Sequence, residues 1–164
     1  IFSVVTDVQD DFQVSNCPLL TNIYLPALET AALVHIETLP SLITLDLSAL
    51  TLLGSGILLI SDVPLTSINL PAFVSSGDVQ INNNSALTSI SMPLWVPSDG
   101  TLNVFNNNAL DVTTVNALLA RGVANAGFVS GTLNLQGGPN AAPTGQGATD
   151  KATLIGRGVT VNTN

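Results

Sequence analysis

The chain has 164 residues, with three Lys or Arg, eleven Asp or Glu and a net charge of −8; 46% of its residues are apolar and 9% are charged. An ordinary soluble domain is about one quarter charged, so this composition excludes a disordered chain and predicts one domain with a single aliphatic core. No apolar run reaches the roughly 20 residues that a membrane-spanning helix needs.

The charges are unevenly distributed along the sequence. Residues 1–120 hold ten of the acidic side chains and no Lys or Arg, and the basic residues follow at Arg121, Lys151 and Arg157. Proteins bind nucleic acids and anionic membranes mainly through Lys and Arg. We therefore expect the first 120 residues to bind neither partner.

One short pattern recurs along the chain, in which two apolar residues flank a polar one. Its second apolar position is Val14 in the first copy and then Ile36, Ile60, Ile81 and Val104, at steps of 22, 24, 21 and 23 residues. Self-similarity at a period of this length is typical of solenoid proteins.

A second kind of segment lies between these copies, at residues 20–26, 42–47, 65–71 and 87–93, and alternates apolar with polar residues. Alternation predicts a half-buried strand, and a recurring Pro marks where the strand ends. A coil with two such strands cannot bury its apolar face alone. The sequence therefore predicts a mainly β fold, a solenoid of stacked two-strand coils.

The character of the repeats changes after Leu110. A helix with one apolar face is expected to be capped by Thr113 or Thr114 and to stop near Gly127, and a weaker second helix is expected at 147–157. The predicted organisation is a single domain over the whole chain, divided into an N-terminal end segment, two-strand coils and helix-bearing coils at 1–11, 12–110 and 111–164.

The N-terminal segment Ile1–Val5 is apolar except for one Ser. Solenoids generally need polar end coils to stay soluble. We therefore expect this end to dock on a neighbouring subunit or on a preceding domain.

Residues 79–84 and 102–107 share the pattern aliphatic-x-aliphatic-x-x-Asn, and Cys17 stands in the Asn position of an earlier copy. This motif resembles the leucine-rich repeat. The two-strand units resemble those of receptor L domains and bacterial surface proteins, and the last 60 residues resemble repeat modules at the ends of tailed-bacteriophage structural proteins. The resemblance implies a leucine-rich-repeat-like solenoid fold.

The Asn position of this motif has a structural interpretation. Asn84 and Asn107 are expected to be buried and to bond backbone groups of adjacent coils, and Cys17 is expected to be a small, buried and inert residue. Three coils have other residues there, which interrupts the expected Asn ladder: Leu39, Val63 and Gly138. Trp95 is expected to fill the edge of the core.

Candidates for chemistry are few, and no cofactor or metal is expected. His35 would be flanked on neighbouring coils by Gln13 and Leu59, neither of which is a good partner for a metal or a catalytic site. Glu37 and Asp46, the one carboxylate pair considered for glycan hydrolysis, are expected on different strands. The acidic group Asp7, Asp10 and Asp11 is either a solvated end or an ion site, and the sequence leaves this open.

The remaining candidate is a binding surface. The outward positions of the main sheet form an amide-rich strip, in which amides suit neutral sugars or other amide surfaces and a Phe ring could stack on a sugar. Alternatively, stacked amides only stabilise adjacent coils. The candidate residues are Gln13, His35, Glu37, Gln80, Asn82, Asn103, Phe105 and Asn134.

These observations lead to the hypothesis of a non-enzymatic structural or adhesion module on a virion or extracellular surface, for assembly or host-surface recognition. The expected partners are other virion or surface-assembly proteins, a neighbouring subunit at the N-terminal end, or a cell-surface glycan. The bacteriophage context is implied by the resemblance alone. The alternatives are a cellular surface adhesin or receptor-type ligand-binding domain and, more remotely, a glycan-degrading enzyme.

Overall fold

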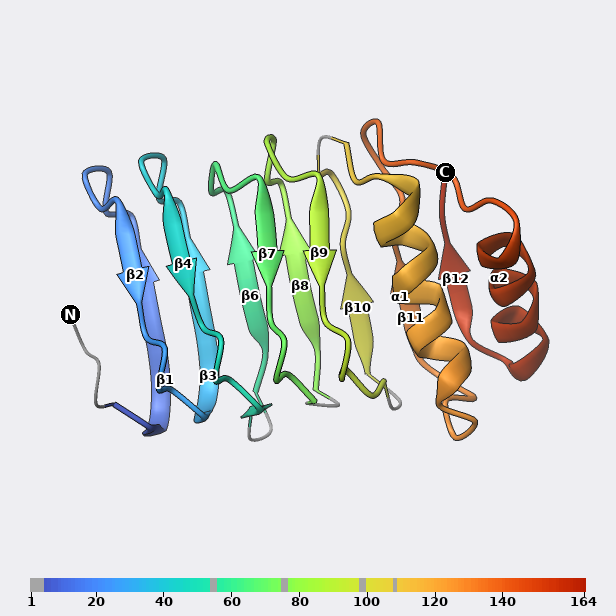
Figure 1. Cartoon of the computed structure of the whole chain (residues 1–164), viewed down its shortest axis with the longest axis horizontal. Coiled ribbons are helices and arrows are strands. Elements are labelled where there is room, and N and C mark those ends of the chain that lie inside the picture. Colours follow the sequence, from blue (N-terminus) through green and yellow to red (C-terminus); the bar gives the residue numbers. More distant parts are fainter. Residues whose placement is uncertain (1–4, 54–55, 75–76, 98–99, 108) are drawn as a thin grey trace.

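The computed structural model describes residues 5–53, 56–74, 77–97, 100–107 and 109–164. Successive coils lie side by side along the longest axis of the molecule, from β1 near the N-terminus to α2 near the C-terminus (Figure 1). The strands are β1 (Asp7–Ser15), β2 (Asn22–Tyr24), β3 (Thr30–Glu37), β4 (Thr44–Asp46), β5 (Leu52–Leu53), β6 (Leu58–Ser61), β7 (Ser67–Asn69), β8 (Val79–Asn82), β9 (Ser89–Ser91), β10 (Thr101–Asn103), β11 (Thr132–Asn134) and β12 (Thr160–Asn162), and the helices are α1 (Val112–Ala124) and α2 (Gln146–Arg157).

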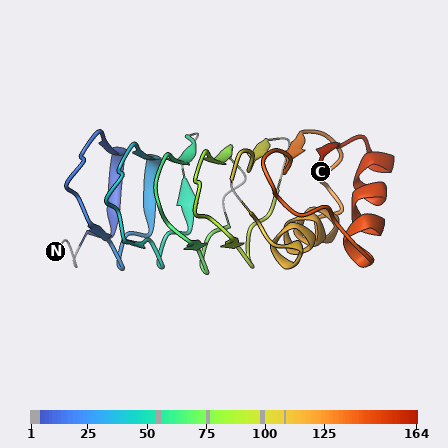
Figure 2. The same cartoon turned by 90° about the horizontal axis from the view of Figure 1, so that it is seen from above.

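Each coil adds one strand to a large parallel sheet in the order β1-β3-β6-β8-β10-β11-β12, and β5 also pairs with β3. The opposite side of the coils carries two small parallel sheets, β2-β4 and β7-β9. Seen from above, the large sheet and the small sheets form two separate layers (Figure 2). The prediction of a mainly β solenoid is confirmed, and the structure shows that its sheets are parallel and that two helices accompany them.

A left-handed residue follows the main strand in each of the first five coils, directly in the first four and three residues later in the fifth. These residues have φ values of 54° to 57° and recur at the same steps of 22, 24, 21 and 23 residues as the sequence pattern: Asn16, Thr38, Asp62, Asn83 and Asn106. Asn and Asp adopt this conformation more easily than other residues with a side chain. The sequence period is thus the distance between equivalent backbone turns.

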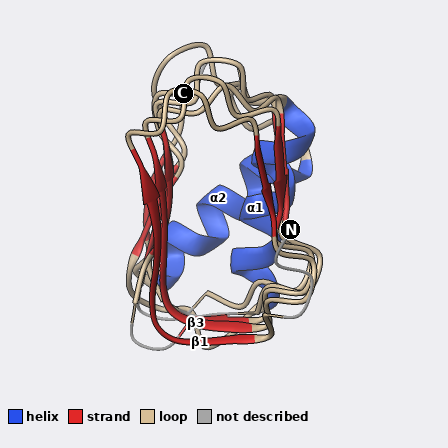
Figure 3. Ribbon diagram, turned by 90° about the vertical axis from the view of Figure 1, so that its left-hand side faces the viewer, coloured by secondary structure: helices blue, strands red, loops and turns tan. Residues whose placement is uncertain are grey.

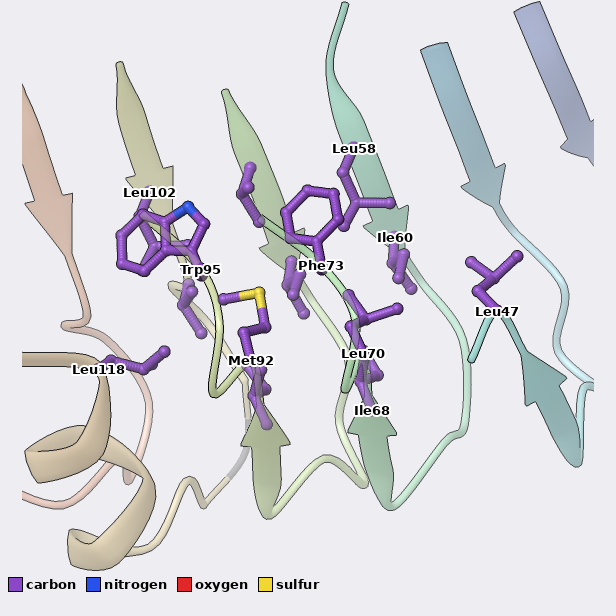
Figure 4. Packing of buried hydrophobic residues seen from close by; sticks show 14 of the residues in the cluster. Leu47, Leu58, Ile60, Ile68, Leu70, Phe73, Met92, Trp95, Leu102 and Leu118 are labelled. Atoms are coloured by element: carbon purple, nitrogen blue, oxygen red, sulfur yellow. The ribbon is translucent and has the colours of Figure 1, made fainter. Parts of the chain in front are cut away.

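The core runs continuously between the two layers (Figure 4). It consists mostly of Leu, Ile and Val side chains, and Phe73 and Trp95 are also buried, at 0% and 2% exposure. Burying one large aliphatic side chain stabilises a fold by about 1.5–3 kcal/mol, so stacking of coils is the main source of stability. The expectation that Trp95 belongs to the core is confirmed.

The start of α1 differs from the expectation that Thr113 or Thr114 caps it. Asp111 is the N-cap, and its Oδ1 accepts a hydrogen bond from the Thr114 backbone N–H at 2.7 Å. The Asp111 backbone N–H is bonded to the Thr88 carbonyl oxygen at 3.0 Å. Because the previous coil holds Asp111 in place, its carboxylate is positioned to satisfy a free N–H of the first turn.

The two helices lie on the side of the small sheets and at the C-terminal end (Figures 1 and 2). They approach closely at Gly122, where an added Cβ would lie 3.1 Å from a Leu154 methyl carbon. Gly158 ends α2 in a left-handed conformation, with φ of 100° and its N–H bonded to the Ile155 carbonyl oxygen. In the part of the chain that the structure describes, no helix covers the outer face of the large sheet.

Candidate binding surface

The strand register aligns one row of side chains across the outer face of the large sheet. Their burial alternates with that of the core positions, as in β8, where Val79 and Ile81 are fully buried and Gln80 is half-buried. The row consists of Gln13, His35, Leu59, Gln80, Asn103, Asn134 and Asn162. Five of the eight predicted strip residues belong to it.

Two carboxylates, Asp11 and Glu37, lie beside the N-terminal part of this row. His35 Nε2 lies 3.1 Å from Glu37 Oε2, two residues along the same strand, and both side chains are partly exposed. The neighbours of His35 in the sheet are Gln13 and Leu59, as predicted. Gln13 is exposed and donates from Nε2 to Asp11 Oδ2 at 3.1 Å. Among the described residues, the imidazole therefore has one carboxylate partner and no hydrogen bond to a side chain of the adjacent strands.

The C-terminal part of the row is an uninterrupted series of amides. Gln80, Asn103 and Asn134 are partly exposed and lie on consecutive strands. On each of the last three strands a Thr precedes the amide residue of the row by two positions. These residues align in register: Thr101, Thr132 and Thr160. The Thr row was not predicted, although the segments Thr-Leu-Asn, Thr-Leu-Asn and Thr-Val-Asn repeat it in the sequence.

Asn82 differs from its expected place on the surface. Only 8% of it is exposed, and its Oδ1 is buried without a hydrogen-bond partner. Asn82 pairs in register with the buried Ser61, and on its other side the Phe105 carbonyl oxygen accepts from the Asn83 N–H at 3.3 Å. Coils on both sides shield this amide from solvent. Phe105 remains partly exposed.

The buried Asn ladder is confirmed at Asn84 and Asn107, both 0% exposed. Asn84 Oδ1 accepts from the Val63 N–H at 3.0 Å and its Nδ2 donates to the Ile60 carbonyl oxygen at 3.1 Å. Asn107 repeats this in the next coil, with Oδ1 accepting from the Asn84 N–H at 3.0 Å and Nδ2 donating to the Ile81 carbonyl oxygen at 2.5 Å. These amides stabilise the stacking of coils and are not available to a ligand.

The expectation that Gly138 interrupts the ladder is wrong, because Asn140 takes over its function. Asn140 is 3% exposed; its Oδ1 accepts from the Leu110 N–H at 3.1 Å and its Nδ2 donates to the Leu135 carbonyl oxygen at 3.2 Å. The longer loop after β11 shifts the amide by two residues. Leu39 and Val63 do replace the amide with buried aliphatic side chains.

Cys17 is exposed, which corrects the expectation that it is buried. Its Sγ donates to the Ser15 carbonyl oxygen at 3.3 Å. Equivalent residues in later coils are covered by the coil before them, whereas Cys17 belongs to the first coil of the row. Its exposure follows from this position at the end.

The acidic group at the N-terminal end is held by single contacts. The Thr30 hydroxyl donates to Asp7 Oδ1, and a register shift between Val8 and Asp11 bends β1 so that it follows a third side of the coil (Figure 3). Within the described residues, no three His, Cys, Asp or Glu side chains come together in a group that could hold a metal ion.

The carboxylates considered for hydrolysis lie on different strands, Glu37 on β3 and Asp46 on β4, as predicted. Asp46 Oδ1 accepts from the Ser48 backbone N–H at 3.0 Å. Two carboxylates that act on one glycosidic bond must flank it from a common cleft. These two belong to opposite layers of the coil.

Comparison with known proteins adds no family. No protein-family model, curated protein or solved structure matches the chain. The fold and the site are therefore interpreted from the residues themselves. In the described part of the chain, neither helix has the length and apolar character needed to cross a membrane.

Proposed function

We propose that the chain is a non-enzymatic binding module of a virion or extracellular surface, which uses the outer face of the large sheet for assembly or for recognition of a neutral glycan. The observation that carries this proposal is the register-aligned amide row of Gln80, Asn103 and Asn134 on the helix-free face. An amide offers both a donor and an acceptor, which matches the hydroxyl groups of a sugar.

The spacing of the row suits a polymer. Adjacent strands of a sheet are about 4.8 Å apart, so the amides of Gln80 and Asn103 present donors and acceptors one such step apart. Asn134 lies one step further, but its Oδ1 is buried without a hydrogen-bond partner and is not offered to a sugar hydroxyl. Phe105 is partly exposed one coil from Asn82, and an aromatic ring at this place suits the apolar face of a sugar. The row contains no Lys or Arg, and this favours a neutral glycan over an anionic one.

We also propose that the coils of this solenoid are leucine-rich-repeat-like. Its support is the amide ladder of Asn84, Asn107 and Asn140, which bonds backbone groups of one coil from the next. A phage virion as the location rests on the resemblance of the C-terminal repeats. Recovery of the protein with purified particles is expected, and recovery with cell envelopes in the absence of particles would favour a cellular adhesin.

A glycan array tests the binding surface. Binding to a neutral glycan is expected for the unchanged protein and is expected to fall about tenfold or more in Asn103→Ala and in Phe105→Ala, since each removes one contact of roughly 1.4 kcal/mol. The matched control is Asn69→Ala, because Asn69 is an exposed residue of β7 on the opposite layer. Glycan binding that survives both strip variants, or no binding to any neutral glycan, would argue for amides that only stabilise the coils.

The first coil supports a further part of the proposal, docking of a neighbouring subunit at the N-terminal end. An open groove of about 370 Å³ there is lined mostly by apolar side chains of the first coil: Phe12, Val14, Leu20, Asn22, Ile23, Tyr24 and Leu25. Val34 and Ile36, the register partners of Phe12 and Val14 in the second coil, are fully buried, whereas Phe12 and Val14 are only partly buried. We expect concentration-dependent association in sedimentation, weakened by Tyr24→Asp and unchanged by Ile155→Asp at the other end. Tyr24 and Ile155 are 46% and 52% exposed, so neither change disturbs the core. A monomer at all concentrations would contradict self-association.

A further inference from the structure

The three basic residues are the only positions at which a trypsin-like protease, which cuts after Lys or Arg, can cleave this sequence. All three lie in helices: Arg121 in α1, and Lys151 and Arg157 in α2. Residues 1–120 contain no bond that such a protease cuts, whether they are folded or not. The susceptibility of the chain is therefore decided by its two helices.

The folded state protects these three bonds in two ways. A protease binds the segment that it cuts in an extended conformation, whereas the backbone groups of a helix bond to one another. The basic side chains are also held by the protein. The Trp95 carbonyl oxygen accepts two hydrogen bonds from Arg121, and the Lys151 Nζ donates to the Thr163 hydroxyl at 2.8 Å. Cleavage therefore requires that a helix first opens.

The helix α2 also shields the cleavage site in α1. Gly122, which follows Arg121, is buried, and a Cβ added to it would lie 3.1 and 3.2 Å from the two methyl carbons of Leu154. Arg157 holds the end of α1, since its Nη1 donates to the Val123 and Asn125 carbonyl oxygens at 3.0 and 3.2 Å. Opening of α2 removes both contacts, so the bond after Arg121 becomes accessible only after α2 has opened.

Of the two helices, α2 is the one that opens more easily. It lies at the C-terminal end of the row of coils (Figure 1), where Leu154 is its one large buried apolar side chain, while α1 buries several, including Leu118 and Leu119. The N-cap of α2 is Gly145, which makes no side-chain cap hydrogen bond, whereas Asp111 caps α1. Segments with few buried apolar contacts open at a lower free energy than the core of a protein.

We propose that α2 controls the cleavage of this protein by trypsin-like proteases. The folded chain resists them, opening of α2 exposes the bonds after Lys151 and Arg157, and the bond after Arg121 is cut last. Each cut is a hydrolysis, in which water adds across the peptide bond and leaves a carboxylate on the basic residue and an amino group on the next. The proposal rests on the helices and is independent of the proposed glycan and subunit surfaces.

Limited digestion of the full chain with trypsin, with the fragments identified by mass spectrometry, tests the order of the cuts. The first products are expected to end at Lys151 or Arg157, and the fragment 1–121 is expected only later. A first cut after Arg121 would overturn the proposal. So would the absence of any cut below the urea concentration at which the whole protein unfolds, because opening of α2 alone would then not admit the protease.

Three variants separate opening of α2 from unfolding of the whole chain. Gly156→Ala favours the helix, since an added Cβ meets nothing within 4 Å, and is expected to slow the first cut about two- to fivefold. Arg157→Gln removes the contact with α1 and is expected to speed the cut after Lys151 about tenfold. Asn84→Ala is the control, because it removes hydrogen bonds between coils far from α2 and is expected to leave the first cut unchanged. An unchanged rate in Gly156→Ala, or faster cleavage in Asn84→Ala, would overturn the proposal.

Discussion

The Arg121 guanidinium donates two hydrogen bonds to the Trp95 carbonyl oxygen, from Nε at 3.0 Å and from Nη2 at 2.8 Å. They join α1 to the bend after β9, at the point where a helix replaces a strand. Arg157 acts similarly one coil later, since its Nη1 donates to the Val123 and Asn125 carbonyl oxygens at the end of α1. Cations are favourable at the C-terminal end of a helix. The basic residues are confined to the C-terminal third because the helical coils use them as internal contacts.

Removal of this contact is expected to destabilise the fold. Arg121→Ala should lower the free energy of unfolding by about 2 kcal/mol, because the Trp95 carbonyl oxygen loses two hydrogen bonds from a charged donor. The free energy of unfolding of Arg121→Lys should lie between those of Arg121→Ala and the unchanged protein, since an ammonium group cannot reproduce the two parallel N–H bonds. Urea denaturation measures both. Lys151→Ala, which removes one bond to the Thr163 hydroxyl, should cost less, and an equal loss for all three would refute the special role of Arg121.

Loss of one amide of the Asn ladder should destabilise the fold more than loss of the Arg121 contact. Asn84→Ala should lower the free energy of unfolding by roughly 3 kcal/mol, because it leaves the Val63 N–H and the Ile60 carbonyl oxygen buried without their partner. Asn69→Ala removes an exposed amide and should change stability by less than about 0.5 kcal/mol. Thermal and urea denaturation of the two variants provide the comparison. A small change in Asn84→Ala would mean that water replaces the amide.

The sequence predicted those features that each coil determines within its own residues. The spacing from Val14 to Val104 follows the turns at Asn16 and Asn106, so the sequence alone shows the period. The predictions were wrong at positions where the burial of a side chain depends on a neighbouring coil. Cys17 is exposed because, among the described residues, its coil is the first in the row, whereas Asn82 is buried because coils lie on both sides.

The helical third was harder to predict for a related reason. Its loops vary in length, so Asn140 and not Gly138 reaches the ladder position. Asp111 is the N-cap because its own N–H is already bonded to the previous coil, a contact that local sequence does not reveal.

The series of left-handed turn residues contains one residue that is unfavourable in this conformation. Thr38 has φ of 54°, where a β-branched side chain is strained, while three of the four equivalent residues are Asn. Thr38→Asn should therefore raise the free energy of unfolding by about 1 kcal/mol, with the N–H to the Ser61 carbonyl oxygen retained. The control Thr44→Asn changes an exposed position of β4, where Asn suits a strand less well, and should not stabilise. A stability curve for Thr38→Asn that matches the unchanged protein would contradict the strain.

The packing of α2 against α1 depends on Gly147. An added Cβ would lie 1.9 Å from Asn116 Oδ1, the atom that accepts from the Thr144 N–H at 3.2 Å, while Asn116 Nδ2 donates to the Thr144 carbonyl oxygen at 3.1 Å. Gly147→Ala should lower the free energy of unfolding by about 1 kcal/mol or more, even though Ala favours a helix over Gly by about 1 kcal/mol.

The matched control is Gly156→Ala in the same helix, where an added Cβ meets nothing within 4 Å. This change should stabilise the protein by about 0.5–1 kcal/mol, because only helix propensity acts there. In an Asn116→Ala background the clash is absent, so Gly147→Ala should no longer destabilise, and a double-mutant cycle measured by urea denaturation isolates the contact. If Gly147→Ala destabilises equally with and without the Asn116 side chain, the steric explanation is wrong and the backbone of α2 itself rejects the methyl group.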